Sequence, residues 1–163
     1  MKEFIGEFLG TFILVLLGDG VVAGNVLKNT KEEGTGWSSI VFGWGIACTV
    51  AVYVAGLFSP AHLNPAVTIA MAATESLAWS KVLLYIVAQL LGAMFAAVIL
   101  WLHYYPHFKE TKDSGAILGM FSTAPAIRHT PSNFFGEALG TAVLVITIMA
   151  IGPNNVAAGF GPI

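Results

Sequence analysis

Four long apolar tracts constrain what this chain can fold into. They cover residues 4–23, 38–58, 82–104 and 133–151. Each has about the twenty residues that a helix needs to cross the hydrocarbon core of a bilayer. Charged residues make up only 10% of the chain, against about 25% in a typical soluble domain. A chain with so few charges cannot cover a water-facing surface, so we expect an all-α, multi-pass protein of the cell membrane, surrounded by lipid bilayer.

Charge and cysteine content exclude several other classes of protein. The formal net charge of −2 provides no basic surface, so we expect no nucleic acid partner. A single cysteine, Cys48, says nothing about the redox compartment. The first tract carries Glu7 and lacks a small-residue cleavage site, so it is interpreted as a retained span and not as a signal peptide.

A polar interruption lies between the second and third tracts. The string SPAHLNPAVT, residues 59–68, stands in a stretch that has no charged residue from 37 to 74. Residues 65–74 can form a helix but are too few to cross a bilayer, so they predict a half helix that enters the membrane and stops. Irregular backbone at membrane depth is tolerated only where it is buried in protein or lines a cavity.

An internal repeat sets the expected topology. Residues 4–18 and 134–148 match at eight of fifteen positions, 130 residues apart. The first copy holds three spans and a half helix, and because three is odd, the second copy must be inverted in the membrane. Inverted repeats place a shared site near the midplane, built from broken helices. The same offset puts a second half helix near position 194, beyond the last residue of this sequence.

The repeat also divides the chain. We expect residues 1–105 to form the first repeat, 106–132 to be a connecting loop, and 133–163 to begin the second repeat. That last part holds the fourth span and an apolar segment from 156, which is expected to begin a fifth. The second repeat is therefore truncated in this sequence.

The start of the half helix predicts a site for neutral solutes. Asn64 is a favoured N-cap, and Pro65 is favoured in the first turn. Unpaired N–H groups give that helix end about half a positive charge, and the Asn64 amide adds donors. Carbonyl acceptors are expected from an extended segment just before it: Pro60, Ala61, His62 and Leu63. Such a row of acceptors ending at a donor suits a passing hydroxyl and opposes a cation.

The string SPAHLNPAVTIA, with its Asn64-Pro65-Ala66 motif, and the paired GEFLGT and GEALGT resemble the major intrinsic protein family of aquaporins and glycerol facilitators. The resemblance covers essentially the whole chain. It implies an aquaporin-like fold of six spans and two half helices that meet at the midplane, in a homotetramer with one pore in each protomer. It also implies passive flow of water or small uncharged solutes, without catalysis, cofactor or metal.

The resemblance extends to individual side chains. It places an aromatic residue at the narrowest point, twenty residues before Asn64, and here this residue is Trp44. Together with FSTAPA at 121–126, Trp44 implies the glycerol facilitator branch, because a flat apolar face suits the carbon edge of a polyol. Cys48, one turn from Trp44, is then expected on the same pore wall. The resemblance further implies hydrogen-bonding support of the pore loops by three side chains: Glu7, Glu137 and Gln89.

Several alternatives remain open from the sequence. A channel of the same family could prefer water or a protonated small acid of the lactic acid type. A proton-coupled carrier could use Glu7, Glu137 and His62 as titrating groups, and a non-conducting structural protein is a third possibility. His62 has no second ligand at metal-binding spacing. With the N-terminus inside, as the family implies, the outer loops carry more Lys and Arg than the inner ones, against the positive-inside rule.

Overall fold

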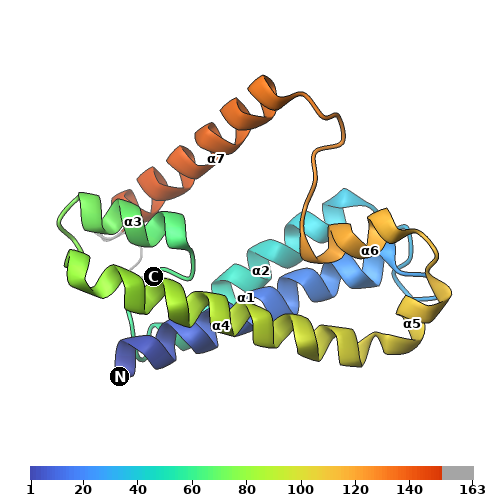
Figure 1. Cartoon of the computed structure of the whole chain (residues 1–163), viewed down its shortest axis with the longest axis horizontal. Coiled ribbons are helices and arrows are strands. Elements are labelled where there is room, and N and C mark those ends of the chain that lie inside the picture. The colour runs from blue at the N-terminus through green and yellow to red at the C-terminus, as the bar shows by residue number, and fades with distance from the viewer. Residues whose placement is uncertain (152–163) are drawn as a thin grey trace.

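The computed structural model describes residues 1–151, in which every regular element is a helix (Figure 1). In chain order the helices are α1 (Lys2–Val26), α2 (Trp37–Ala55), α3 (Pro65–Ala73), α4 (Trp79–His103), α5 (Tyr105–Glu110), α6 (Ser114–Phe121) and α7 (Thr130–Ile151). The fifth apolar segment expected from residue 156 lies outside the described residues.

Four of these helices are long and apolar enough to cross a membrane, namely α1, α2, α4 and α7. They correspond to the four tracts predicted from the sequence, with ends that differ by a few residues. The half helix predicted at 65–74 is α3, which has 9 residues. The prediction of an all-α membrane protein is therefore confirmed.

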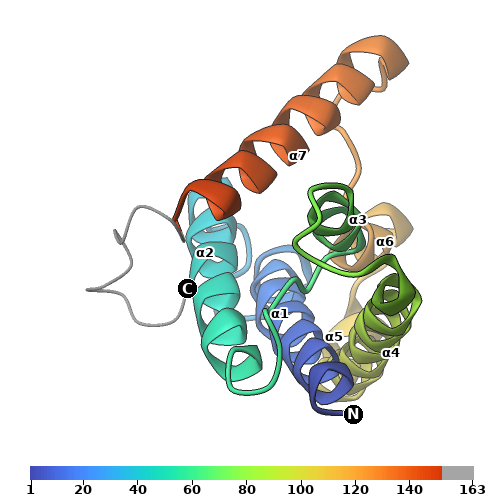
Figure 2. The same ribbon diagram turned by 90° about the vertical axis from the view of Figure 1, so that its left-hand side faces the viewer.

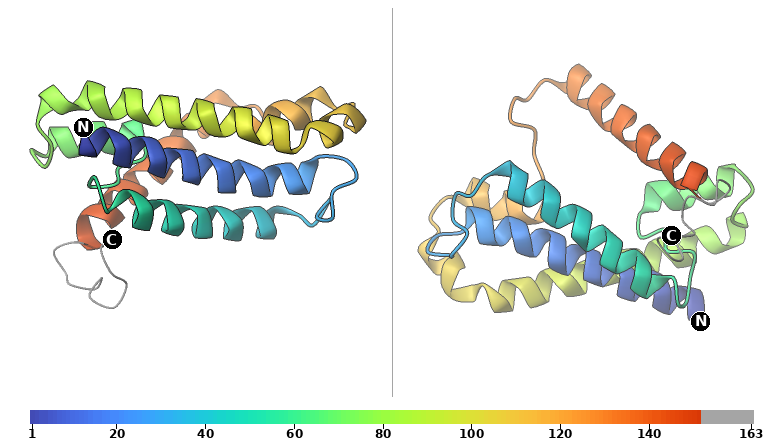
Figure 3. Two further views of the ribbon diagram at one scale, coloured as in Figure 1. Left: turned by 90° about the horizontal axis from the view of Figure 1, so that it is seen from below. Right: turned by 180° about the vertical axis from the view of Figure 1, so that it is seen from behind.

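Helix α1 lies between α2 and α4, and the three run side by side along the molecule (Figures 2 and 3). Glycines allow their backbones to approach closely. A methyl group added at Gly92 of α4 would lie 3.1 Å from the backbone nitrogen of Phe12 in α1. On the other side of α1, a methyl group at Gly43 of α2 would lie 2.6 Å from Cγ2 of Val21. The central position of α1 allows it to contribute side chains to both neighbours.

The connecting segment 106–132 packs back onto the spans, which the sequence did not predict. Asp113 is the N-cap of helix α6, and its Oδ1 accepts hydrogen bonds from the backbone nitrogens of Gly115 and Ala116 at 2.8 and 3.2 Å. Met120 of α6 is 1% exposed and joins the core cluster formed by α1, α2 and α4. Thr111 accepts a hydrogen bond from the backbone nitrogen of Lys28 at 2.9 Å. This segment therefore covers one end of the three-helix layer.

Two ion pairs mark the opposite ends of the bundle. Lys81 contacts Glu3 at 2.8 Å and ties the start of α4 to the start of α1. Lys28 contacts Glu33 at 2.6 Å in the loop between α1 and α2. The hydrogen bond from the Lys28 ammonium holds the pKa of the Glu33 carboxyl below its ordinary value. The first three spans thus alternate in direction, as the predicted topology requires.

Helix α7 stands apart from the other three spans and contacts α3 (Figure 1). Val145 of α7 packs against a buried cluster from α3, the turn after it and the first part of α4, which consists of Val67, Met71, Ala72, Leu77 and Tyr85. The first span of the second repeat therefore lies against the half helix of the first repeat.

Candidate functional site

The half helix α3 begins as the sequence predicts. Asn64 has extended dihedral angles, φ −152° and ψ 126°, and its Oδ1 accepts a hydrogen bond from the Ala66 nitrogen at 2.8 Å. Pro65 occupies the first helical turn, where backbone N–H groups have no partner within the helix, so its missing N–H costs no hydrogen bond. The side chain therefore caps the helix with its oxygen. Its Nδ2 donors have no protein acceptor within residues 1–151.

The backbone before Asn64 differs from the simple extended segment expected from the sequence. Ala61 and Leu63 have φ values of 57° and 52°, in the left-handed region. Such conformations cost about 1–3 kcal/mol each in residues other than glycine. The expectation was wrong because the local propensities of these residues give no sign of the distant carboxylate, Glu7, that holds them.

Three successive N–H groups of this loop point to the same side. The Ala61 nitrogen donates to Ser59 Oγ at 3.1 Å. The His62 and Leu63 nitrogens donate to the two carboxylate oxygens of Glu7 at 3.0 and 2.8 Å. Successive N–H groups that converge in this way form an anion-binding concavity. Bonds to a charged acceptor are stronger than neutral ones and offset the backbone strain.

The direction of these N–H groups fixes the direction of the carbonyls. In a planar trans peptide the N–H of one residue is antiparallel to the C=O of the residue before it. The carbonyls of Pro60, Ala61 and His62 therefore point away from the side on which Ser59 and Glu7 lie. This produces a row of acceptors that leads to the Asn64 amide. The Leu63 side chain, by contrast, is buried against α1 and α2 at 5% exposure.

Glu7 is fully buried and lies at the centre of a hydrogen-bond network. Besides the two loop nitrogens it accepts bonds from Ser59 Oγ and Gln89 Nε2, both at 2.8 Å. An ionised carboxylate is an acceptor with about four lone-pair sites, which matches these four donors. Gln89 Nε2 also donates to Thr68 Oγ1 at 2.9 Å. The network therefore joins α1, α3 and α4 around the loop.

His62 is half-buried beside this network. Its Nδ1 lies 3.3 Å from Thr68 Oγ1, and its ring centroid lies 5.0 Å from that of Tyr85. In residues 1–151 no group of three or more His, Cys, Asp or Glu side chains is placed to hold a metal ion. The contacts of His62 serve to position the loop against α3 and α4.

Trp44 lies between two cavities. One, of about 510 Å³, is lined by α1, α2, α6 and the residues just after α6. The other, of about 440 Å³, is lined by α1, α4 and the end of α6, together with Trp44. Cys48 is exposed and lines neither of these two cavities. Glu137 is exposed on α7, so the described structure does not bring it to the Glu7 network. The structure thus brings Asn64 and His62, which were predicted to line the pore, together with Glu7 and Gln89, which were predicted to support the pore loop.

Sequence reasoning missed three contributors. Ser59 and Thr68 belong to the Glu7 network, and their signal was the clustering of hydroxyl residues around the half-helix start. Asp19 lines the cavity of about 440 Å³ beside Trp44. Its signal was an ionisable residue inside an apolar span, which favours a functional position.

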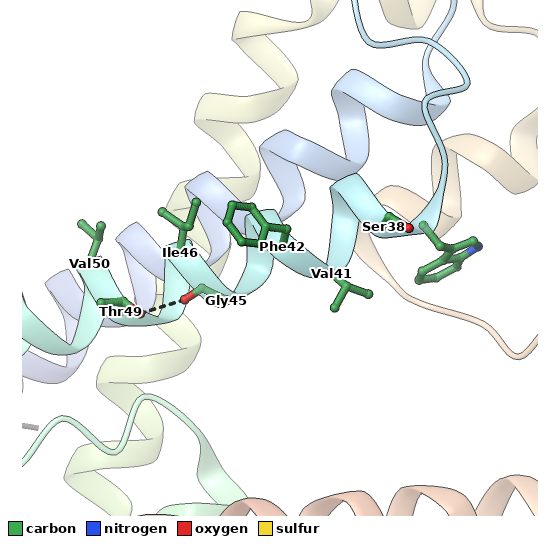
Figure 4. Close-up of a pocket in the computed structure, with 8 residues that line it drawn as sticks. Ser38, Val41, Phe42, Gly45, Ile46, Thr49 and Val50 are labelled. Atoms are coloured by element: carbon green, nitrogen blue, oxygen red, sulfur yellow. Dashed lines mark hydrogen bonds between the residues drawn. The ribbon is translucent and has the colours of Figure 1, made fainter. Parts of the chain in front are cut away.

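A groove of about 730 Å³ runs along the outer face of α2 (Figure 4). Its lining comes from α2 alone: Trp37, Ser38, Val41, Phe42, Gly45, Ile46, Thr49 and Val50. The hydroxyl of Thr49 donates to the Gly45 carbonyl at 2.9 Å, so this polar group is already paired within the helix. Within residues 1–151 no polar groups from other elements converge on this face, which is an apolar surface of the span.

Comparisons with known proteins agree with this geometry. The sequence model of the family described as major intrinsic protein matches residues 1–162. A glycerol uptake facilitator protein of Streptococcus pneumoniae is 55% identical over 161 residues, which are 99% of this chain and 69% of that protein. A glycerol uptake facilitator protein of Bacillus subtilis is 48% identical over 163 residues, which are 100% of this chain and 60% of the relative.

A solved structure gives the same result for the fold. The aquaglyceroporin from Plasmodium falciparum is 36% identical with a TM-score of 0.63, over 69% of this chain and 46% of that one. The structural match therefore covers about half of that aquaglyceroporin, and this chain spans 69% and 60% of the two bacterial relatives. The family match, the relatives and the capped half helix lead to one conclusion: this chain belongs to the major intrinsic protein family of membrane channels.

Proposed function

We propose that this chain forms part of a passive channel for glycerol and other small uncharged solutes, with water. The observation that carries the proposal is the loop before α3. Its N–H groups are held by Ser59 and Glu7. The carbonyls of the same peptides therefore form a row that ends at Nδ2 of Asn64, which has no acceptor within residues 1–151.

This arrangement can exchange hydrogen bonds with a neutral solute step by step. A hydroxyl group donates to one carbonyl after another and then accepts from Asn64. The N-terminus of α3 carries a partial positive charge that opposes a cation at the same place. No bond of the solute is made or broken, so the proposed activity needs no catalytic residue and no cofactor.

Two observations support glycerol as the solute. The relatives from Streptococcus pneumoniae and Bacillus subtilis are named glycerol uptake facilitator proteins. Trp44 also offers an apolar ring beside two cavities, which suits the carbon edge of a polyol. By the same family resemblance we propose a homotetramer in the cell membrane, in which each protomer has its own pore.

The experiment uses the natural protein that contains these residues, reconstituted in liposomes and mixed with an inward glycerol gradient in a stopped-flow instrument. We expect rapid swelling that grows linearly with the gradient and does not depend on a pH difference. Empty liposomes are the control. Saturable uptake driven by a pH gradient would instead identify a carrier. Selective uptake of lactic acid at low pH, without glycerol uptake, would identify the small-acid alternative.

A further inference from the structure

Asp19 is an ionisable side chain within the first membrane span. It is half-buried in the second half of the 25-residue helix α1, about two turns before the last residue, Val26. Its side chain helps to line the cavity of about 440 Å³, together with Val15, Trp44, Ala93, Met94, Ala97, Phe121 and Thr123. Apart from Trp44, whose indole has one polar atom, and Thr123, this lining is apolar.

No described residue donates a hydrogen bond or forms an ion pair with the Asp19 carboxyl group. Glu7 on the same helix shows the contrast, because four donors surround it. An ionisable group inside a membrane is unfavourable unless it is paired or faces a polar cavity. The Asp19 carboxyl group therefore faces a cavity, and no protein group within residues 1–151 pairs with it.

The neighbours of Asp19 give this cavity an amphipathic wall. The indole of Trp44 rests on Gly18, the residue just before Asp19 in α1. Trp44 and Thr123 each line both cavities, so they stand between the two spaces. An apolar ring, a carboxyl group and a hydroxyl group thus surround the same volume. This combination matches a molecule that has a carbon edge and several hydroxyl groups.

We propose that Asp19 is a solute-binding residue that forms a polyol subsite with Trp44 and Thr123, on the α6 side of the proposed constriction. The Asp19 oxygens accept hydrogen bonds from solute hydroxyls, and the indole packs against the carbon edge. The subsite adds a specificity-determining carboxyl group to the wall of the channel. This inference rests on the proposed function, because a polyol must travel past Trp44.

The first test compares two substitutions at Asp19 in the natural protein, reconstituted in liposomes. Asp19→Leu removes the acceptors at similar size, and we expect the permeability for glycerol relative to water to fall about tenfold. Asp19→Asn keeps one acceptor and should stay within about threefold of wild type. Val98→Leu is the matched control, since Val98 is 53% exposed on the outer surface of α4.

The second test measures accessibility without relying on transport. Asp19→Cys is treated with a small hydrophilic thiol reagent in liposomes, and the modified peptide is identified by mass spectrometry. We expect modification at position 19, slowed by glycerol. Val98→Cys lies on an exposed face of α4 that we expect to contact lipid, so it should not react. No modification at position 19 would overturn the proposed subsite, because a solute could not reach it either.

The outcomes separate this inference from the proposed function. Glycerol conduction by wild type with an unchanged glycerol-to-water ratio in Asp19→Leu would overturn the subsite and leave the channel function standing. A wild-type protein that conducts no glycerol would overturn the proposed function, and the polyol subsite with it. A reduced ratio in Asp19→Leu, together with glycerol-protected labelling at position 19, supports both.

Discussion

The indole of Trp44 rests directly on the backbone of Gly18. A methyl group added at Gly18 would lie 2.5 Å from Cε3 and 2.6 Å from Cη2 of the indole. The ring can take this position only because α1 has no side chain there. The orientation of the proposed constriction residue on α2 is therefore set by a glycine on α1.

This contact predicts the effect of Gly18→Ala. The new methyl group overlaps the indole, so we expect the ring to move and the protein to lose about 1–3 kcal/mol of stability. The glycerol-to-water permeability ratio should change together with the tryptophan fluorescence. Gly20→Ala is the control two residues further on, since its methyl group would lie 3.6 Å from Leu100 Cδ2. Equal effects of both substitutions would contradict the prediction.

Trp44 itself provides the second prediction. Trp44→Ala removes the apolar wall between the two cavities, so larger polyols should gain permeability relative to glycerol. Trp44→Phe keeps a flat ring and should change the ratio much less. Stopped-flow swelling with glycerol and a five-carbon polyol measures both. If Trp44→Ala leaves the ratio unaltered, the indole lies outside the solute path.

The third prediction concerns Glu7. In Glu7→Gln an NH2 group replaces one of the two carboxylate oxygens. Each of these oxygens accepts two hydrogen bonds, so in either orientation of the amide the NH2 group faces two donors. We expect a loss of at least about 1.5 kcal/mol of stability, the lower end for one hydrogen bond to a charged group. Relaxation of the loop at 60–63 should also lower solute flux. Thermal unfolding in detergent and liposome swelling are the measurements.

The matched control for that prediction is Glu3→Gln, the same change one turn earlier on α1. Glu3 pairs with Lys81 at the surface, where such a pair contributes about 0–1 kcal/mol. A loss of stability in Glu3→Gln as large as that in Glu7→Gln would mean that the buried network has no special role.

Most of the fold could be predicted because the membrane imposes strong rules. Length and apolarity alone identify the four spans, and Asn64-Pro65 marks the first residue of α3. The short helices α5 and α6 escaped prediction because 6 and 8 residues are too few for a clear periodic pattern. Asp113 before an apolar run was the one local signal for α6.

The site was predictable where a single residue determines its own geometry. Asn64 caps α3 through a local bond to Ala66, which sequence spacing can reveal. The left-handed conformations of Ala61 and Leu63 depend instead on hydrogen bonds to Ser59 and Glu7. Glu7 lies more than fifty residues earlier in the chain. Long-range contacts of this kind leave no local pattern, so the row of carbonyls could be expected but its backbone geometry could not.

Asn64→Asp gives the most specific test of the α3 terminus. Asp is as good an N-cap as Asn, so the bond to the Ala66 nitrogen and the fold should persist. The change replaces the Nδ2 donor by a second carboxylate oxygen. Its negative charge offsets the partial positive charge of the helix end, so the barrier to cations should fall and a cation leak should appear. Conductance in planar bilayers measures this leak, and Asn64→Ala, which loses the cap without adding a charge, is the control. A cation leak in Asn64→Asp no larger than in Asn64→Ala would place the Asn64 amide outside the solute path.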